Sequence, residues 1–266
     1  MSALLSTYPV DVVAISESWL HKNLDDSLLS INSYNLFRKD RINSRGGGIC
    51  AYLKYDIPCT QRLDLENNDF EVLWLCLRPK RLPRPISGIA VCIVYHPPGL
   101  SVLEHKDLNN YLINSADFIR NKYPDHGLVI LGDFNDFKIG NLTSNQNLKQ
   151  VVDHPTRGLA TLDLIITNLH KFYNNPTILA PFGSSDHSIV HWFPPADSAT
   201  INNTSVKPVK HLVCRYPRSG IDAFGRWITT QNWFSELSPN PTVDSLAVSL
   251  TYQLTQTTKE GKTPSD

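Results

Sequence analysis

The sequence predicts a layered fold that combines β-strands with α-helices, and three observations support this. Short apolar runs of strand length recur over the first 195 residues, as in Leu128–Leu131. One interval between two runs has the apolar spacing of a helix, and its start, Ser101 to Glu104, matches a capping box. Polar side chains directly follow several of the runs, which is where layered α/β folds present residues to a ligand.

The strands and helices can be assigned in order along the chain. Residues 3–7 have the pattern of a helix end, which Pro9 stops. The long helix begins at Ser101 and ends before Pro124, whereas Gly132 is expected to end the strand 128–131. Residues 138–150 form a polar stretch without a predicted element. The predicted strands span residues 10–15, 35–37, 49–54, 71–77, 87–95, 128–131, 161–167 and 188–193.

The composition of the chain bounds its organisation. The 266 residues suffice for one large domain, or for a domain with an appendage, and 41% of them are hydrophobic. The formal net charge is zero, so any attraction to a polyanion must be local. Five widely spaced cysteines without a CxxC pair indicate a reduced, intracellular protein. No apolar stretch resembles a membrane span or a signal peptide.

The chain changes character after Pro195. Residues 196–207 are polar and resemble a linker. Two amphipathic helices are predicted beyond them, at about residues 221–237 and 243–254. We therefore expect one domain over residues 1–195 and a linker with a helical segment over residues 196–266.

Four polar residues are expected at strand ends. Asp133 and Asn135 follow the run 128–131, Glu17 follows the strand 10–15, and Tyr95 ends the strand 87–95. The two side chains of Asp133 and Asn135 can point to the same side of an extended segment. Gly-Asp-Phe-Asn is also compatible with an ordinary turn, so this segment alone leaves both interpretations open.

Two further carboxylates and a histidine occur later in the chain. Asp163 lies in the middle of the apolar run 161–167, and a buried carboxylate there needs a partner: a backbone amide, a cation or a histidine. Asp186 and His187 precede the last predicted strand. They can supply a metal ligand and a general acid or base, although a single histidine is more often structural.

Basic side chains gather in one segment after the strand 35–37. The segment also contains three consecutive glycines, which allow close approach of a phosphate backbone. A solvated hairpin loop explains the pattern equally well. The basic residues that we consider for contact with a phosphate backbone are Arg38, Lys39, Arg41 and Arg45, together with Arg157 further along the chain.

Together, these carboxylates, the histidine, the asparagine and the tyrosine are the kinds of side chain that metal-assisted hydrolysis of a phosphodiester uses. Carboxylate oxygens favour Mg²⁺, or Mn²⁺, as the ion. The sequence contains no cysteine–histidine cluster, which disfavours zinc, and no P-loop, which disfavours a nucleoside triphosphatase.

Six sequence segments occur in a distinctive order: SESWL (16–20), RGGGICAYLK (45–54), VYHPP (94–98), LGDFN (131–135), TLDLIITN (161–168) and SSDHSIV (184–190). These segments resemble the endonuclease–exonuclease–phosphatase superfamily, and more narrowly the apurinic-type endonuclease domain of non-LTR retrotransposons. The resemblance covers about residues 1–195. The tail is similar to the segment that links such an endonuclease to a reverse transcriptase, a partner domain that this chain does not contain.

The resemblance implies an α+β fold, a two-layer β-sandwich flanked by helices, and DNA as the substrate. It implies that Glu17 and Asp186 bind or surround Mg²⁺ and that Tyr95 and Asn135 contact phosphate. Asp133 is expected to activate the attacking water or assist the leaving group.

The resemblance also implies that His187, oriented by Asp163, stabilises the charged transition state. Such domains begin with a strand that carries an active-site Asn, whereas this sequence starts within the following helix, so we expect the first strand to be missing and activity to be impaired. The alternatives are a phosphatase or sphingomyelinase-type phosphodiesterase of the same superfamily, and an inactive DNA-binding remnant.

Overall fold

A computed structural model describes residues 2–8, 10–41 and 46–195 of the chain, all of which belong to one compact unit, Met1–Thr200. The linker and the helices predicted over 196–266 lie outside the described residues. Within the described part, no helix combines the length and the apolar character that crossing a bilayer requires.

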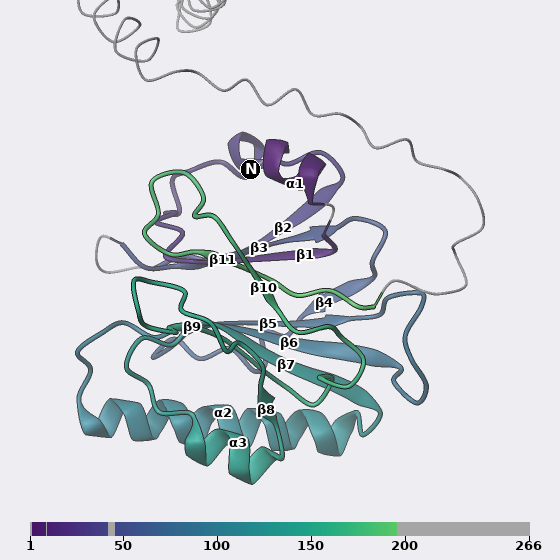
Figure 1. Ribbon diagram of the computed structural model, residues 1–266, viewed down its shortest axis with the longest axis vertical. Coiled ribbons are helices and arrows are strands. Elements are labelled where there is room, and N and C mark those ends of the chain that lie inside the picture. The colour runs from purple at the N-terminus through teal and green to yellow at the C-terminus, as the bar shows by residue number, and fades with distance from the viewer. Residues whose placement is uncertain (1, 9, 42–45, 196–266) are drawn as a thin grey trace, which may run out of the picture. The chain divides into compact units, whose positions relative to one another are not determined.

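Two β-sheets and flanking helices build this unit (Figure 1). The smaller sheet has the strand order β1-β3-β2, and the larger sheet has the order β4-β5-β6-β7-β9-β8. Strands β10 and β11 form a separate pair. The elements are α1 (Ser2–Thr7), β1 (Val12–Ser16), η1 (Asp26–Leu29), β2 (Tyr34–Lys39), β3 (Ile49–Lys54), β4 (Cys59–Gln61), β5 (Glu71–Leu77), β6 (Gly88–Tyr95), α2 (Val102–Lys122), β7 (His126–Asp133), α3 (Gly140–Gln146), β8 (Lys149–Gln150), β9 (Asp163–Thr167), β10 (Thr177–Leu179) and β11 (Ile189–His191).

The strands β5, β6 and β7 are buried on both faces because alternate side chains enter two different cores. Trp74 and Ile130 point into the core beneath α2, whereas Leu73, Ile93 and Val129 point into the core shared with the smaller sheet. Such strands read as continuous apolar runs in the sequence. The sheets therefore stack as a sandwich, with α2 and α3 along the outer face of the larger sheet (Figure 1). The predicted α+β sandwich is confirmed.

Helix α2 connects β6 to β7 and makes these two strands parallel. Its predicted capping box is present: the Ser101 side chain accepts a hydrogen bond from the backbone N–H of Glu104, and the Glu104 carboxylate accepts one from the backbone N–H of Ser101. Leu108, Leu112 and Ile119 of the predicted stripe are buried against the sheet.

The prediction that Gly132 ends its strand is wrong. Gly132 lies within β7 and pairs with Val94 on one side and Leu164 on the other. Its φ is 137°, and a Cβ at this position would lie 1.9 Å from the carbonyl oxygen of Val94. Glycine is needed here because the neighbouring backbone leaves no space for a side chain, so β7 continues to Asp133.

Several other element boundaries also differ from the prediction. Strand β2 continues through Arg38 and Lys39, so these residues belong to the sheet rather than to the following loop. Asp163 begins β9 instead of lying in its middle. The polar stretch 138–150 contains α3 and β8, and the short elements β4, η1 and β10 were also missed. These elements are too short for hydrophobic periodicity to reveal them.

Candidate active site

Four polar side chains form a row across the larger sheet. Glu71 on β5 pairs in register with Tyr95 on β6, Tyr95 with Asp133 on β7, and Asp133 with Asp163 on β9. Directly paired residues point to the same face of a sheet. This face also carries the core shared by the two sheets. The row therefore lies where that core ends, at one edge of the sandwich.

Asn135 is brought beside Asp133 by a turn. Its φ is 45°, in the left-handed region that Asn tolerates better than most residues. The backbone N–H of Asn135 donates to Oδ1 of Asp133 at 3.0 Å. Its Nδ2 donates to Oδ2 of Asp133 at 3.1 Å and to the carbonyl of His96 at 2.8 Å. The sequence was compatible with an extended segment and with a turn, and the structure has a turn, which also brings the two side chains together.

His187 is paired with Asp163, and a histidine was one of the partners expected for this carboxylate. His187 Nδ1 lies 2.8 Å from Oδ2 of Asp163, and the two side chains are 20% and 21% exposed. One ligand atom each of Asp133, Asp163 and His187 lie within 4.8 Å of one another. Because Nδ1 faces Asp163, Nε2 is the imidazole nitrogen left to meet a substrate.

Thr156 fixes the positions of Asp163 and His187, a role that was not predicted from the sequence. It is 1% exposed, and its Oγ1 accepts hydrogen bonds from the backbone N–H groups of Leu162 and Asp163, at 3.0 and 3.1 Å. Its carbonyl accepts one from the backbone N–H of Ser188 at 2.7 Å. A single buried residue thus joins the strand that carries Asp163 to the segment that carries His187.

Glu17 approaches the row from the smaller sheet. It follows β1 with a φ of 51°, in a segment whose backbone is tied to the glycines before β3: the N–H of Ser18 donates to the carbonyl of Gly48. The Glu17 carboxylate accepts a hydrogen bond from the hydroxyl of Tyr95. Burial and this hydrogen bond both raise the pKa of Tyr95.

The pKa of Asp133 is raised to about 6, chiefly because the carboxyl is buried. A hydrogen bond from the Asn135 backbone lowers it, and His187 has the same effect. The charges of Asp163 and Glu17 raise it further. The carboxylates of Asp133, Asp163 and Glu17 therefore lie close together in a partly buried site, where their negative charges repel one another.

A divalent cation fits this cluster. It would relieve the repulsion between the carboxylates, and their oxygens are the ligands that Mg²⁺ and Mn²⁺ prefer. Asp186, the second predicted metal ligand, is placed differently: its Oδ2 lies 2.6 Å from Nη2 of Arg157, and both side chains are about half exposed or more.

The basic residues predicted to bind DNA are engaged within the protein. Arg38 pairs with Asp26 and Asp40 and donates to backbone carbonyls. Lys39 donates to the carbonyl of Asn67, and Arg41 pairs with Glu71. Arg157, which pairs with Asp186, is the most exposed of the described members of this set, with 49% of its side chain exposed. Arg45 lies outside the described residues.

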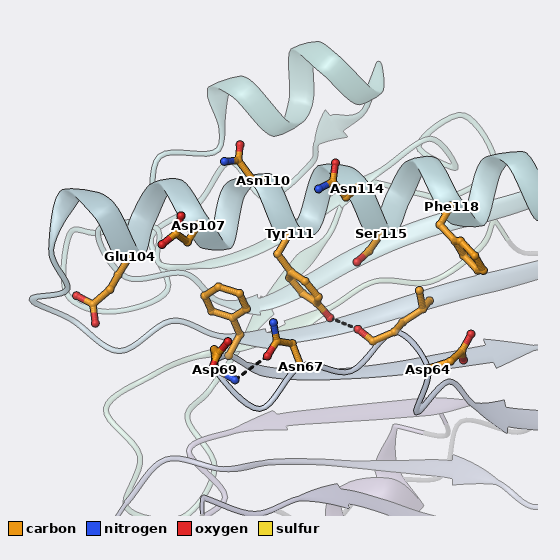
Figure 2. A pocket seen from close by; sticks show the side chains of 12 residues that line it. Asp64, Asn67, Asp69, Glu104, Asp107, Asn110, Tyr111, Asn114, Ser115 and Phe118 are labelled. Carbon is orange, nitrogen blue, oxygen red and sulfur yellow. Dashed lines mark hydrogen bonds between the residues drawn. The ribbon is translucent and has the colours of Figure 1, made fainter.

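A groove with a volume of about 970 Å³ lies elsewhere, between α2 and the segment that precedes β5 (Figure 2). Its acidic lining residues are Asp64, Asp69, Glu104 and Asp107, and its lining contains no lysine or arginine. Such a surface repels a phosphate backbone. The groove is therefore a poor candidate for a phosphate ligand, and none of its lining residues belongs to the cluster of Asp133, Asp163 and His187.

The profile described as the "Endonuclease/Exonuclease/phosphatase family" matches residues 1–187, more than half of the chain. The chain belongs to this family. The resemblance to this superfamily that was inferred from the sequence motifs is thereby confirmed. No curated protein sequence matches the chain significantly.

Solved structures share the fold of the family. The endonuclease domain of TRAS1, a telomere-specific non-LTR retrotransposon, has a TM-score of 0.54 and 14% sequence identity, covering 73% of this chain and 90% of that one. A 3′-5′ exonuclease (NExo) from Neisseria meningitidis has a TM-score of 0.51 and 15% identity, covering 72% and 92%. At these identities the likeness shows the fold alone.

Proposed function

We propose that the chain is a magnesium-dependent endonuclease that nicks DNA, of the type that serves a non-LTR retrotransposon. The observation that carries this proposal is the cluster of Asp133, Asp163 and His187 at the edge of the sandwich. The family name covers nucleases and phosphatases, so the substrate must be argued from the site. The motif set described above favours DNA. Arg157, whose side chain is 49% exposed and lies beside Asp186, also favours DNA.

His187 and Asp163 act together on the phosphate. Asp163 accepts a hydrogen bond from Nδ1 of His187 and holds the imidazole in one orientation. Nε2 then donates to a phosphoryl oxygen as negative charge develops there. Electrostatic stabilisation of this kind is commonly the largest catalytic contribution.

Asp133 is suited to activating water. Its raised pKa, about 6, is close to the range in which a general base works best near neutral pH. Asn135 holds this carboxylate through its backbone N–H and its Nδ2. The phosphate contact predicted for Asn135 would replace one of the hydrogen bonds that Nδ2 now donates.

Glu17 is the residue that would hold the magnesium ion, with Asp186 available if its pair with Arg157 opens. When bound, the ion supplies positive charge to the scissile phosphate. Tyr95 holds the Glu17 carboxylate through its hydroxyl. Residues 196–266 would connect this domain to a reverse transcriptase in a longer protein.

Plasmid nicking by the full chain tests the proposal. Supercoiled plasmid is incubated with Mg²⁺ or with EDTA, using the natural chain, Asp133→Asn and the control Asp153→Asn, which alters an exposed carboxylate. Relaxed circles that require both Mg²⁺ and Asp133, and that survive the control change, support the proposal. Cleavage of a phosphoinositide without nicking would overturn it in favour of a phosphatase. DNA binding without cleavage would overturn it in favour of an inactive remnant.

A further inference from the structure

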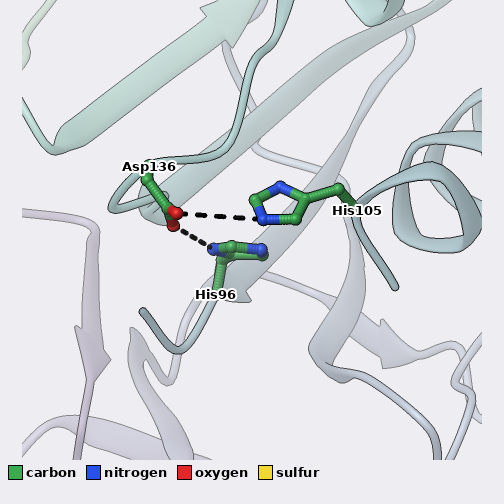
Figure 3. A group of neighbouring side chains, drawn as sticks. All are labelled: His96, His105 and Asp136. Carbon is green, nitrogen blue, oxygen red and sulfur yellow. Dashed lines mark ion pairs between the residues drawn. The ribbon is translucent and has the colours of Figure 1, made fainter. Parts of the chain in front are cut away.

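A second group of metal-ligand side chains lies beside the active-site turn (Figure 3). His96 follows β6, His105 lies near the start of α2, and Asp136 follows β7. One ligand atom from each lies within 4.8 Å of the others. The carboxylate of Asp136 faces both imidazoles: Oδ1 is 3.6 Å from Nδ1 of His96, and Oδ2 is 3.8 Å from Nε2 of His105.

These separations suit two ligands of one ion better than direct hydrogen bonds. A hydrogen bond between nitrogen and oxygen is about 2.9 Å long. Two ligands at about 2.0 Å from a tetrahedral ion are about 3.3 Å apart. The observed 3.6 and 3.8 Å are closer to this spacing than to the length of a hydrogen bond.

The buried imidazole of His96 is the independent sign of a ligand. His96 is 0% exposed, and neither ring nitrogen has a hydrogen-bond partner among the described residues. An unsatisfied buried polar group costs about 1–3 kcal/mol, so such groups in native structures call for a partner. Burial lowers the pKa of His96 and so favours the neutral imidazole, which is the form that binds metals.

Aromatic packing restricts the rings of this group. The centroids of His96 and His105 are 4.6 Å apart. The ring of Phe137 is nearly parallel to that of His105, with an interplanar angle of 6° and centroids 6.0 Å apart. Restricted rings lose little conformational freedom when they bind an ion.

We propose that His96, His105 and Asp136 bind one divalent transition-metal ion, such as Zn²⁺, with water completing its coordination. Two imidazoles and one carboxylate form a set that zinc accepts, whereas Mg²⁺ prefers oxygen ligands. This site is therefore chemically distinct from the carboxylate cluster around Asp133. It does not depend on the proposed nuclease function.

Such an ion would cross-link three segments next to the active-site turn. His96 and Asp136 come from the ends of β6 and β7, and His105 comes from α2. The carbonyl of His96 already accepts a hydrogen bond from Nδ2 of Asn135 at 2.8 Å, and Asp136 directly follows Asn135. Binding the ion would hold Asn135, and with it Asp133, more firmly in position.

Cobalt binding tests the site directly. The full chain is treated with a chelator, supplied with excess Mg²⁺ to occupy oxygen sites, and titrated with Co²⁺, whose visible absorption reports coordination by nitrogen. His105→Gln and Asp136→Asn remove one ligand each. His154→Gln is the matched control, because His154 also lies beside an aspartate, Asp153, but is exposed. His187→Gln separates this site from the catalytic cluster.

We expect one Co²⁺ per chain in the natural protein and in both controls, and displacement of that ion by Zn²⁺. Affinity should fall at least about tenfold in His105→Gln and in Asp136→Asn. Zn²⁺ should raise the melting temperature of the natural protein but not that of these two variants. Absence of the absorption in the natural protein, or its loss in His187→Gln and retention in His105→Gln, would overturn the proposal. Asp136 is 57% exposed, so Asp136→Asn keeps the test valid if the other variant does not fold.

Discussion

Two histidine–aspartate pairs in this protein have similar lengths and different surroundings. Nδ1 of His187 lies 2.8 Å from Asp163, and Nδ1 of His154 lies 3.0 Å from Asp153. The first pair joins residues distant in sequence and is about one-fifth exposed, whereas the second joins neighbours and is about two-thirds exposed. Among the residues that the structure describes, the first pair forms a group with another carboxylate, that of Asp133, and the second pair does not belong to such a group.

The comparison shows that surroundings, rather than the pair itself, give the residues a chemical role. Water screens the exposed pair and solvates each member separately, so the pair contributes little to either stability or chemistry. Partial burial strengthens the electrostatic interaction between His187 and Asp163. Three changes can test how far this difference goes.

The largest expected effect is that of His187→Gln on DNA nicking. The rate should fall by about 10²–10⁴-fold, because the imidazole that we propose to stabilise charge on the phosphate is lost. His154→Gln should change the rate by less than about twofold. Initial rates of plasmid relaxation in Mg²⁺ measure both. The double change His187→Gln with Asp163→Asn should be little worse than His187→Gln alone, since the pair acts as a unit; fully multiplied losses would contradict this.

A smaller effect is expected from the threonine that supports the first pair. Thr156→Val deprives the backbone N–H groups of Leu162 and Asp163 of their acceptor, which should lower the free energy of unfolding by about 2 kcal/mol. Thr161→Val removes an exposed hydrogen bond to the carbonyl of His154 and should cost less than about 0.5 kcal/mol. Urea unfolding measures both variants. Equal losses would show that Thr156 has no special structural role.

The smallest effect is expected for Asp133, the carboxylate beside the pair of His187 and Asp163. The pKa of Asp133 is about 6 in the folded protein, against an ordinary 3.8. The folded state therefore holds this proton more tightly, and the stability it contributes is full below about pH 3.8 and lost as the pH rises through 6.

The variant Asp133→Asn has no carboxyl group to ionise at this position, so it should not lose stability as the pH rises through 6. In EDTA, it should be more stable than the natural chain by about 1–2 kcal/mol at pH 8, with the difference vanishing near pH 4. Asp153→Asn, at the exposed pair, should follow the natural chain across the range. Denaturant midpoints at several pH values give the comparison. A less stable Asp133→Asn at pH 8 would contradict the expected sign.

The sequence predicted those parts of the fold that depend on continuous local patterns. Strands β3 and β5 have the predicted bounds because each is one apolar run. The extent of β7 was missed because the reason for Gly132 is the carbonyl of Val94 on a neighbouring strand. Local periodicity carries no information about such a contact.

The site residues show the same difference between what local patterns predict and what depends on contacts between distant segments. Asp163 was expected to have a partner because a buried carboxylate needs one, and His187 is that partner. The importance of Thr156 and the grouping of His96 with His105 and Asp136 were not predicted. Both depend on segments that meet only after the strands have paired.

The polar row from Glu71 to Asp163 has a consequence for how the protein acquires activity. Its members lie on four strands and pair across the sheet, so no local piece of chain contains the site. Contacts between distant segments form late because loop closure costs entropy before they are made. A nascent or damaged chain should therefore have no partial activity, and a catalytic assay would count only those molecules whose large sheet is complete.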